Sequence, residues 1–323
     1  MKCINRPIIF LTGAILFGTI FSGCEQVEEA VVTPYEMGQY NTSLYRGGLF
    51  SSDLCVTNTN VDIPNYATDA TLHAAALFGV NQKQVYYADR IHERLFPAST
   101  TKILTAYLAL KYGNLSDPVT ISAHATTELP AGSSVAGFKE GDQTTLEDLL
   151  YGLMLPSGND SAVAIAEKIS GSVEAFAELM NQEAMAMGAT NSHFVNPHGF
   201  QDENHYTTAY DLYLIFNQCI KDERFLTIVA AGSHTTVITG VDGVGREVTW
   251  NPTNYFAQGK AVLPGNVTLA GGKTGTTDEA GSCLILLTKD PNANPYISII
   301  MGGSTKAVLY NDMTALIGAL PVG

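Results

Sequence analysis

The order of strand and helix patterns along this 323-residue chain constrains its fold more than any other sequence feature. Two apolar runs, 72–80 and 85–87, flank the polar pair Asn81-Gln82 and predict a strand, a turn and a strand. Helical periodicity fills the middle, and short β-prone runs return at 269–276, 283–288 and 296–302. Strands first, helices next and strands last imply an α+β fold, in which late strands complete an antiparallel sheet beside a helical cluster.

Helix punctuation supports the boundaries of the helical segments. Pro97 stands just before one helical pattern and Gly113 ends it. Thr144 and Glu147 form a capping box, and Thr208 is placed to cap a later helix. The predicted helices are 99–112, 144–155, 160–169, 173–187, 208–220 and 311–320.

The N-terminus is typical of an export signal. Lys2 and Arg6 precede an apolar run at 8–21 that has no positive stop-transfer flank. The small residues before Cys24 resemble a lipobox, in which the cysteine is lipidated; the alternative is an ordinary cleaved signal. We therefore expect a signal peptide at 1–23, an acidic and polar tether at 24–62 and a folded domain at 63–323, held outside the cytoplasm on the outer face of the cell membrane or secreted.

Charge, cysteine spacing and histidine spacing limit the partners and metal sites that this chain can have. The chain has 31 acidic and 17 basic residues, and its net charge of −14 would repel nucleic acid. Beyond Cys24, the chain has Cys55, Cys219 and Cys283 without any C-x-x-C spacing. We expect buried free thiols, with one disulfide as the alternative. The histidines lack metal-ligand spacing, so no metal and no cofactor is expected.

The first chemical motif is Ser99-Thr100-Thr101-Lys102, an S-x-x-K at the predicted helix start. Residues i and i+3 share a helix face, so the Lys102 amine can reach the Ser99 hydroxyl. A serine hydroxyl needs a neighbouring base, and a buried lysine with a lowered pKa can supply one. Taken alone, this motif is equally compatible with an amphipathic helix whose lysine is exposed to solvent.

The second motif is Ser157-Gly158-Asn159, which follows an apolar helix. A tight turn here would project a hydroxyl that can relay a proton and an amide that can hold a substrate carbonyl. A plain helix-connecting turn is the alternative.

The third motif is Lys273-Thr274-Gly275-Thr276. Glycine in a strand permits the close approach of another backbone, and a peptide can add there as an extra strand. Lys273 would supply positive charge, and the threonine hydroxyls would bind a carboxylate. A phosphate loop is excluded, because Val267 stands where its first glycine is required.

These three motifs in this order mark class A β-lactamases and penicillin-binding proteins. Four longer segments narrow the resemblance: 96–102, 155–160, 196–200 and 272–281. Across roughly 65–320 the chain resembles low-molecular-mass penicillin-binding proteins of the serine-type D-alanyl-D-alanine carboxypeptidase family, peptidase S11. The resemblance implies a β-lactamase/transpeptidase-like fold: a five-stranded antiparallel sheet flanked by helices, with a helical subdomain.

The resemblance also implies roles for individual residues. Ser99 matches the acylated nucleophile, Lys102 the general base, and Ser157 and Asn159 the groups that move protons and position substrate. The implied carboxylate-binding set is Lys273, Thr274, Gly275 and Thr276, and the implied oxyanion donors are the N–H groups of Ser99 and Thr276. His198 and His205 also match the family pattern, and we expect them to structure a loop.

The function implied is removal of the terminal D-Ala from peptidoglycan stem peptides through an acyl-enzyme on Ser99, with β-lactams as covalent inhibitors. A β-lactamase is the first alternative and would need a deacylating acid such as Glu203. A non-catalytic β-lactam sensor is the second, and a transpeptidase differs only in its acceptor.

Family members carry an Arg near the C-terminus that assists carboxylate binding. The comparable stretch here has only Lys306, and whether Lys306 replaces the Arg stays open.

Overall fold

The computed structural model describes residues 50–265 and 267–320. The predicted signal peptide at 1–23, the lipidation site Cys24 and most of the predicted tether lie outside the described residues. The chain divides into a unit at 1–52 and a unit at 53–323, and the second unit holds all the strands and α-helices named below. A short 3-10 helix, η3 (Phe50–Asp53), spans the boundary.

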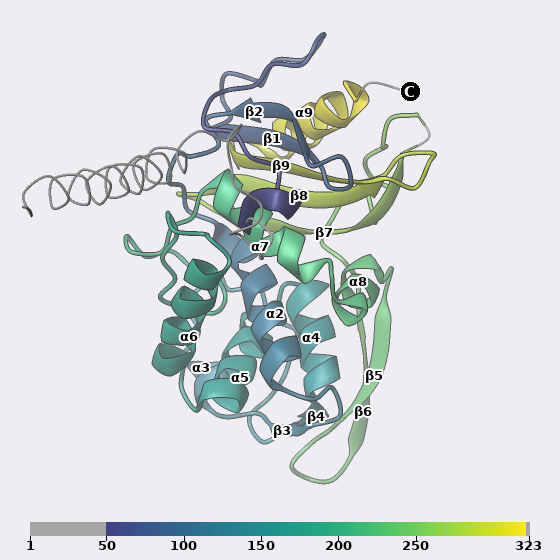
Figure 1. Cartoon of the computed structure of the whole chain (residues 1–323). Helices are drawn as coiled ribbons and strands as arrows, with labels where there is room; N and C mark the ends of the chain where they lie inside the picture. Colours follow the sequence, from purple (N-terminus) through teal and green to yellow (C-terminus); the bar gives the residue numbers. More distant parts are fainter. Residues whose placement is uncertain (1–49, 266, 321–323) are drawn as a thin grey trace, which may run out of the picture. The chain divides into compact units, whose positions relative to one another are not determined.

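One sheet of five antiparallel strands organises the second unit, as the sequence predicted (Figure 1). Its spatial order is β2-β1-β9-β8-β7, so β7 forms an edge. The bounds are β1 Ala74–Gly79, β2 Gln84–Asp89, β7 Thr268–Thr277, β8 Gly281–Lys289 and β9 Pro295–Gly303. The β1–β2 hairpin therefore joins the late strands through the pairing of β1 with β9.

Helices cover both faces of this sheet (Figure 1). Helix α9 (Lys306–Gly318) packs on β8 and β9, while α7 (Ala209–Cys219) contacts β1 and β9 from the helical cluster. The other α-helices are α2 Lys102–Tyr112, α3 His124–Thr127, α4 Leu146–Met154, α5 Asn159–Ser170, α6 Val173–Ala186 and α8 Glu223–Ala230. Because both faces are covered, β8 is buried along nearly its whole length, which explains its unbroken apolar run.

Three local predictions need correction. The short strand β4 (Gln143–Thr145) runs directly into α4, which begins at Leu146, one residue later than the predicted Thr144–Glu147 box requires. The α4 cap is therefore Thr145, whose side chain accepts from the Asp148 N–H. Helix α9 begins at Lys306 rather than 311, since Thr305 caps it by accepting from the Val308 N–H. The predicted helix at 99–112 starts as the 3-10 turn η4 (Ala98–Thr101), and α2 begins only at Lys102. The Thr208 cap is confirmed.

A second sheet was not predicted from the sequence. Its order is β3-β4-β5-β6, with β3 at Pro118–Thr120, β5 at His234–Thr239 and β6 at Gly245–Trp250. The long β5–β6 hairpin alternates exposed with more buried positions. Its buried end is anchored by Trp250, whose indole N–H donates to the Ala136 carbonyl at 2.8 Å.

The packed body begins ahead of residue 63, where the sequence placed its start. Cys55 is fully buried, and its N–H donates to the Tyr213 hydroxyl at 2.9 Å. Val61 pairs with Ala88 as an isolated bridge. Cys55, Cys219 and Cys283 are free, as expected. Within the described residues, no helix has the length and apolarity needed to cross a membrane.

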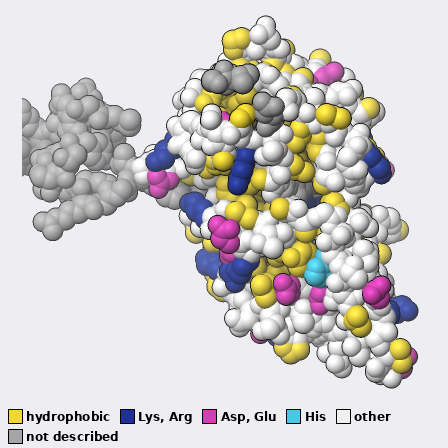
Figure 2. All heavy atoms as spheres, turned by 90° about the vertical axis from the view of Figure 1, so that its right-hand side faces the viewer, with side chains coloured by type: hydrophobic (Ala, Val, Ile, Leu, Met, Phe, Trp, Pro, Cys, Tyr) yellow, Lys and Arg dark blue, Asp and Glu magenta, His cyan; other side chains and the backbone are white. Residues whose placement is uncertain are grey.

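Surface charge is distributed rather than gathered on the face drawn in Figure 2. Acidic and basic side chains lie interspersed there among uncharged and hydrophobic atoms. On this face, therefore, the excess of acidic residues does not form one continuous patch.

Candidate active site

Ser99 lies on η4, pressed against the edge strand β7. Residues i and i+3 eclipse one another in a 3-10 turn, which places the Ser99 and Lys102 side chains together. A Cβ on Gly275 would lie 2.9 Å from both the Pro97 carbonyl oxygen and the Ser99 nitrogen, so β7 can approach this turn only through a glycine. Ala98, the residue before Ser99, has φ of +46°. Such strained backbone conformations are frequent at functional sites.

The Lys102 amine is fully buried and lies among three oxygen atoms. Its Nζ is 3.0 Å from Ser99 Oγ, 2.7 Å from Asn159 Oδ1 and 2.8 Å from the His198 carbonyl oxygen. The amide and carbonyl oxygens can only accept, so a neutral amine donates its two N–H bonds to them. Its lone pair then faces the Ser99 hydroxyl, which is the arrangement a general base requires.

Burial is what makes a neutral amine favourable here. Desolvation, followed by repulsion from Lys273, lowers the pKa of Lys102 well below its ordinary value, while Asp160 acts in the opposite direction. Burial likewise lowers the pKa of Lys273 to about 7. The site thus holds two buried amines that repel each other's charge.

The second motif meets the third across the cleft. Lys273 Nζ donates to Ser157 Oγ at 2.9 Å and to the Thr274 carbonyl at 2.9 Å. Ser157 has φ of +67°, a backbone conformation that residues other than glycine rarely adopt and that is often found at functional sites. The sequence named Lys273 as a source of positive charge but gave no sign of its contact with Ser157.

Asn159 and Asp160 fasten the loop at 131–138 beside Ser99. Asn159 Nδ2 donates to Ser133 Oγ at 3.0 Å, so its amide is fixed with the oxygen toward Lys102. The buried carboxylate of Asp160 accepts from the N–H groups of Ala136, Gly137 and Phe138. The sequence reasoning missed this loop, whose only signal was a run of small residues.

Two cavities flank Ser99, and both include Ser99 and Thr276 in their walls. One, which we name the Lys306 cavity, also contains Thr274, Tyr255 and Lys306. The other, the Glu279 cavity, also contains Thr277, Asp278 and Glu279. All eight predicted motif residues lie at this cleft or bond directly to groups that line it; they are Ser99, Lys102, Ser157, Asn159, Lys273, Thr274, Gly275 and Thr276.

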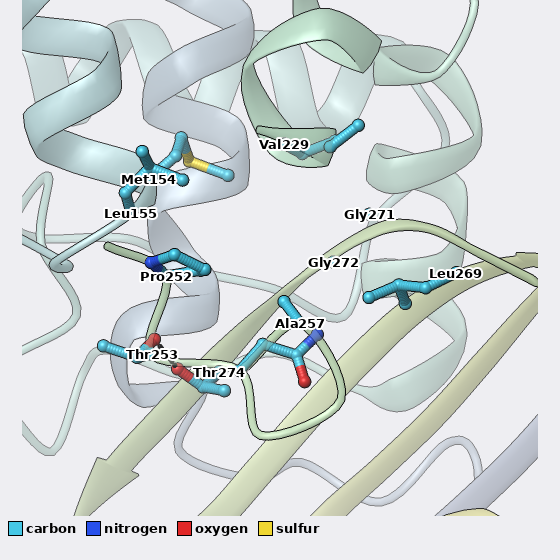
Figure 3. Close-up of a pocket in the computed structure, with 12 residues that line it drawn as sticks. Met154, Leu155, Val229, Pro252, Thr253, Ala257, Leu269, Gly271, Gly272 and Thr274 are labelled. Carbon is cyan, nitrogen blue, oxygen red and sulfur yellow. Dashed lines mark hydrogen bonds between the residues drawn. The ribbon is translucent and has the colours of Figure 1, made fainter. Parts of the chain in front are cut away.

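A third, smaller pocket adjoins β7 on its upstream side (Figure 3). Gly271, Gly272 and Leu269 line it from the strand, opposite Leu155 and Pro252. In Figure 3 Thr253 and Thr274 point toward one another, and their hydroxyls are 2.6 Å apart. This contact holds the Thr274 side chain at the wall of the Lys306 cavity.

His198 and His205 bond to residues of the site and of the neighbouring loop, as expected from the sequence. His205 Nε2 lies 2.8 Å from Thr101 Oγ1, and its Nδ1 accepts from the Val195 N–H at 3.1 Å. His198 contributes its carbonyl to Lys102, a contact that the sequence did not indicate. Burial lowers the pKa of His205 to about 3 and that of His198 well below its ordinary value, so both are uncharged.

Glu203, the predicted deacylating acid of the β-lactamase alternative, is exposed and does not belong to the walls of either cavity.

This geometry can be compared with known proteins. The sequence profile of the D-alanyl-D-alanine carboxypeptidase family, peptidase S11, matches residues 61–305. The chain belongs to this family. Among its relatives in peptidase S11, D-alanyl-D-alanine carboxypeptidase DacF of Bacillus subtilis is 34% identical over 237 residues, covering 72% of this chain and 57% of that protein. DacA of Escherichia coli is 32% identical, covering 71% and 55%. The chain thus spans a little over half the length of these relatives.

Solved structures of a DD-transpeptidase and of a D-alanyl-D-alanine carboxypeptidase share the fold. The DD-transpeptidase of Streptomyces K15 is 28% identical with a TM-score of 0.72, over 80% of this chain and 98% of that one. A D-alanyl-D-alanine carboxypeptidase from Mycobacterium tuberculosis is 25% identical with a TM-score of 0.68, over 81% of this chain and 94% of that one. The β-lactamase/transpeptidase-like fold expected from the sequence is confirmed.

Proposed function

We propose that this chain is a serine-type D-alanyl-D-alanine carboxypeptidase that removes the terminal D-Ala from peptidoglycan stem peptides through an acyl-enzyme on Ser99. One observation carries the proposal: Lys102 Nζ lies 3.0 Å from Ser99 Oγ while the oxygens of Asn159 and His198 accept two of its N–H bonds, so in a neutral amine the lone pair is left for the Ser99 hydroxyl. Membership of peptidase S11 supports the same reaction.

In the acylation step, Ser99 Oγ bonds to the carbonyl carbon of the scissile peptide while its proton moves to the Lys102 amine. The developing oxyanion is stabilised by the N–H groups of Ser99 and Thr276, to which we assign the oxyanion hole. The C–N bond then breaks, and the proton held by Lys102 passes to the departing D-Ala nitrogen with Ser157 as the relay. In the second half, the oxygen of a water molecule bonds to the ester carbon while Lys102 takes one of its protons. The bond from that carbon to Ser99 Oγ then breaks, and Lys102 returns the proton to Ser99 Oγ, which frees the shortened peptide with its new carboxylate.

The Lys306 cavity would hold the carboxylate of the departing D-Ala. Lys273 is buried behind it, Thr274 and Thr276 face it, and Gly275 keeps the strand close to Ser99. We propose that Lys306 supplies a further positive charge at this end, in the place where family members have an Arg.

The decisive experiment is D-Ala release from a D-Ala-D-Ala peptide by the wild-type protein and by Ser99→Ala. We expect release by the wild type, inhibition by penicillin, and neither release nor penicillin labelling in the variant. Persistent labelling without release would instead indicate a sensor, and rapid turnover of penicillin would indicate a β-lactamase. Adding an amino acid acceptor tests for transpeptidation, because the acyl-enzyme would then yield a new peptide bond.

We further propose export through a signal peptide at 1–23 and anchoring to the outer face of the cell membrane by lipid on Cys24. The basic start, the apolar run and the small residues before Cys24 support this. Cells fed a labelled fatty acid should label the wild-type protein and leave Cys24→Ser unlabelled. Equal labelling of both proteins would contradict lipidation at this residue.

A further inference from the structure

The cleft has opposite charges on the two sides of Ser99. The Lys306 cavity has a lysine in its wall, and the Glu279 cavity has two acidic residues. Both cavities meet at Ser99 and Thr276, so a single extended peptide bound along the β7 edge would contact the two ends together.

The positive end is built on α9. Lys306 is the first residue of that helix, is exposed, and lies with its Nζ 5.8 Å from the centroid of the Tyr255 ring. Tyr255 in turn stacks on Tyr310, with ring centroids 4.6 Å apart. Within the described part of the chain Lys306 has no carboxylate partner, so its charge is available to a ligand.

The negative end is the turn between β7 and β8. Asp278 and Glu279 form this turn, which is fixed by the Ala280 N–H donating to Thr277 Oγ1 at 3.0 Å. Both carboxylates are exposed, and neither belongs to an ion pair among the residues that the structure describes. Of the described residues in this cavity wall none is Lys or Arg, and His198 is uncharged.

These charges fix the direction of a bound peptide. A C-terminal carboxylate is attracted by Lys306 and repelled by Asp278 and Glu279, so the peptide ends in the Lys306 cavity. Its preceding residues must then leave past Thr277 toward the acidic turn, at about 3.3 Å per extended residue. The residue before D-Ala-D-Ala is then directed into the Glu279 cavity, whose wall includes Asp278 and Glu279.

We propose, as an extension of the carboxypeptidase function above, that Asp278 and Glu279 select donor peptides whose residue before D-Ala-D-Ala carries a side-chain ammonium group. The selective contact is an ion pair at the open end of the Glu279 cavity. It is separate from the reacting atoms, so it acts on the choice of substrate rather than on the acyl-transfer chemistry.

The test compares Nα-acetyl-L-Lys-D-Ala-D-Ala with Nα,Nε-diacetyl-L-Lys-D-Ala-D-Ala, which differ only in the charge of the side-chain amine. For the wild-type protein we expect kcat/KM for D-Ala release to be about fivefold higher with the free amine, the size of one or two exposed ion pairs. In the double variant Asp278→Asn/Glu279→Gln the ratio should fall to about one. The ratio in the wild type should also decline as salt is added.

A matched control removes two acidic residues outside the cleft, Glu178→Gln/Glu247→Gln, both of which are exposed. This variant should keep the wild-type ratio, which separates a local contact from the overall charge of the protein. A ratio of one in the wild type, or an unchanged ratio in the Asp278/Glu279 variant, would overturn the inference. Failure to release D-Ala from either peptide, with penicillin labelling as the check on folding, would overturn the carboxypeptidase proposal and this inference together.

Discussion

Lys102 and Lys273 are both buried, yet the proposed reaction requires a different protonation state of each. Lys102 must be neutral to accept the Ser99 proton, whereas Lys273 acts as a positive charge near the substrate carboxylate. Burial lowers the pKa of Lys273 to about 7, so this charge is lost as pH rises through neutrality. The repulsion between the amines lowers the pKa of Lys102 still further.

The pH dependence of D-Ala release tests this division. We expect kcat/KM to rise from acidic pH as Lys102 loses its proton and to fall again around pH 7 as Lys273 loses its own. In Lys273→Arg the guanidinium stays charged, so the alkaline decline should disappear even though the rate is lower overall. A wild-type profile that is flat between about pH 6 and 9 would contradict the roles given to the two lysines.

Gly275 offers a second test at the scale of one residue. A Cβ there would lie 2.9 Å from Pro97 O and from Ser99 N, so Gly275→Ala must push η4 away from β7. We expect acylation by fluorescent penicillin to slow by about 100-fold, the cost of displacing a reacting group by roughly 1 Å. Gly232→Ala is the control, because its Cβ would meet nothing within 4 Å. Acylation of both variants at the wild-type rate would show that this close approach is not needed.

Among the elements, the start of α5 holds the active-site loop through one buried carboxylate. Asp160 accepts from Ala136 and Ser161 through Oδ1 and from Gly137 and Phe138 through Oδ2. In Asp160→Asn an NH2 group would replace one of these oxygens and face backbone N–H donors. We expect the free energy of unfolding to fall by about 2–3 kcal/mol in urea titrations.

The control for this prediction is Asp242→Asn. Asp242 also accepts from a backbone N–H, that of Val244, but at the exposed tip of the β5–β6 hairpin. Its stability should change by no more than about 0.5 kcal/mol. Equal effects of the two substitutions would mean that the 131–138 loop does not depend on Asp160.

The same elements show what the sequence could and could not predict. The five sheet strands were predicted because their apolar runs are separated by turn residues, and the motif residues because they occur in a fixed order. The β5–β6 hairpin was missed, because its strands carry many polar side chains and its contacts join distant segments: Trp250, for example, bonds to a carbonyl 114 positions away. Contacts between distant segments, such as His198 O with Lys102, leave no local pattern in the sequence.

For the molecule as a whole, two buried amines impose a cost on folding that depends on pH. The pKa of Lys273 is about 7 in the folded chain against an ordinary 10.5, so between these values the unfolded chain binds more protons. Stability therefore rises with pH across this window: the full cost of burying a charged amine is present below pH 7 and fades toward pH 10.5. A shift of this size corresponds to about 5 kcal/mol.

Lys273→Met should therefore be inactive but more stable than the wild type, because the apolar side chain removes the cost of the buried charge. The gain in unfolding free energy should be largest near pH 6 and should shrink as both proteins are taken toward pH 10, measured by urea unfolding at each pH. Lys139→Met, which removes an exposed amine, should show no such trend. If Lys273→Met were less stable than the wild type at pH 6, its hydrogen bonds to Ser157 and the Thr274 carbonyl would outweigh the burial cost, and the site would not be a source of instability.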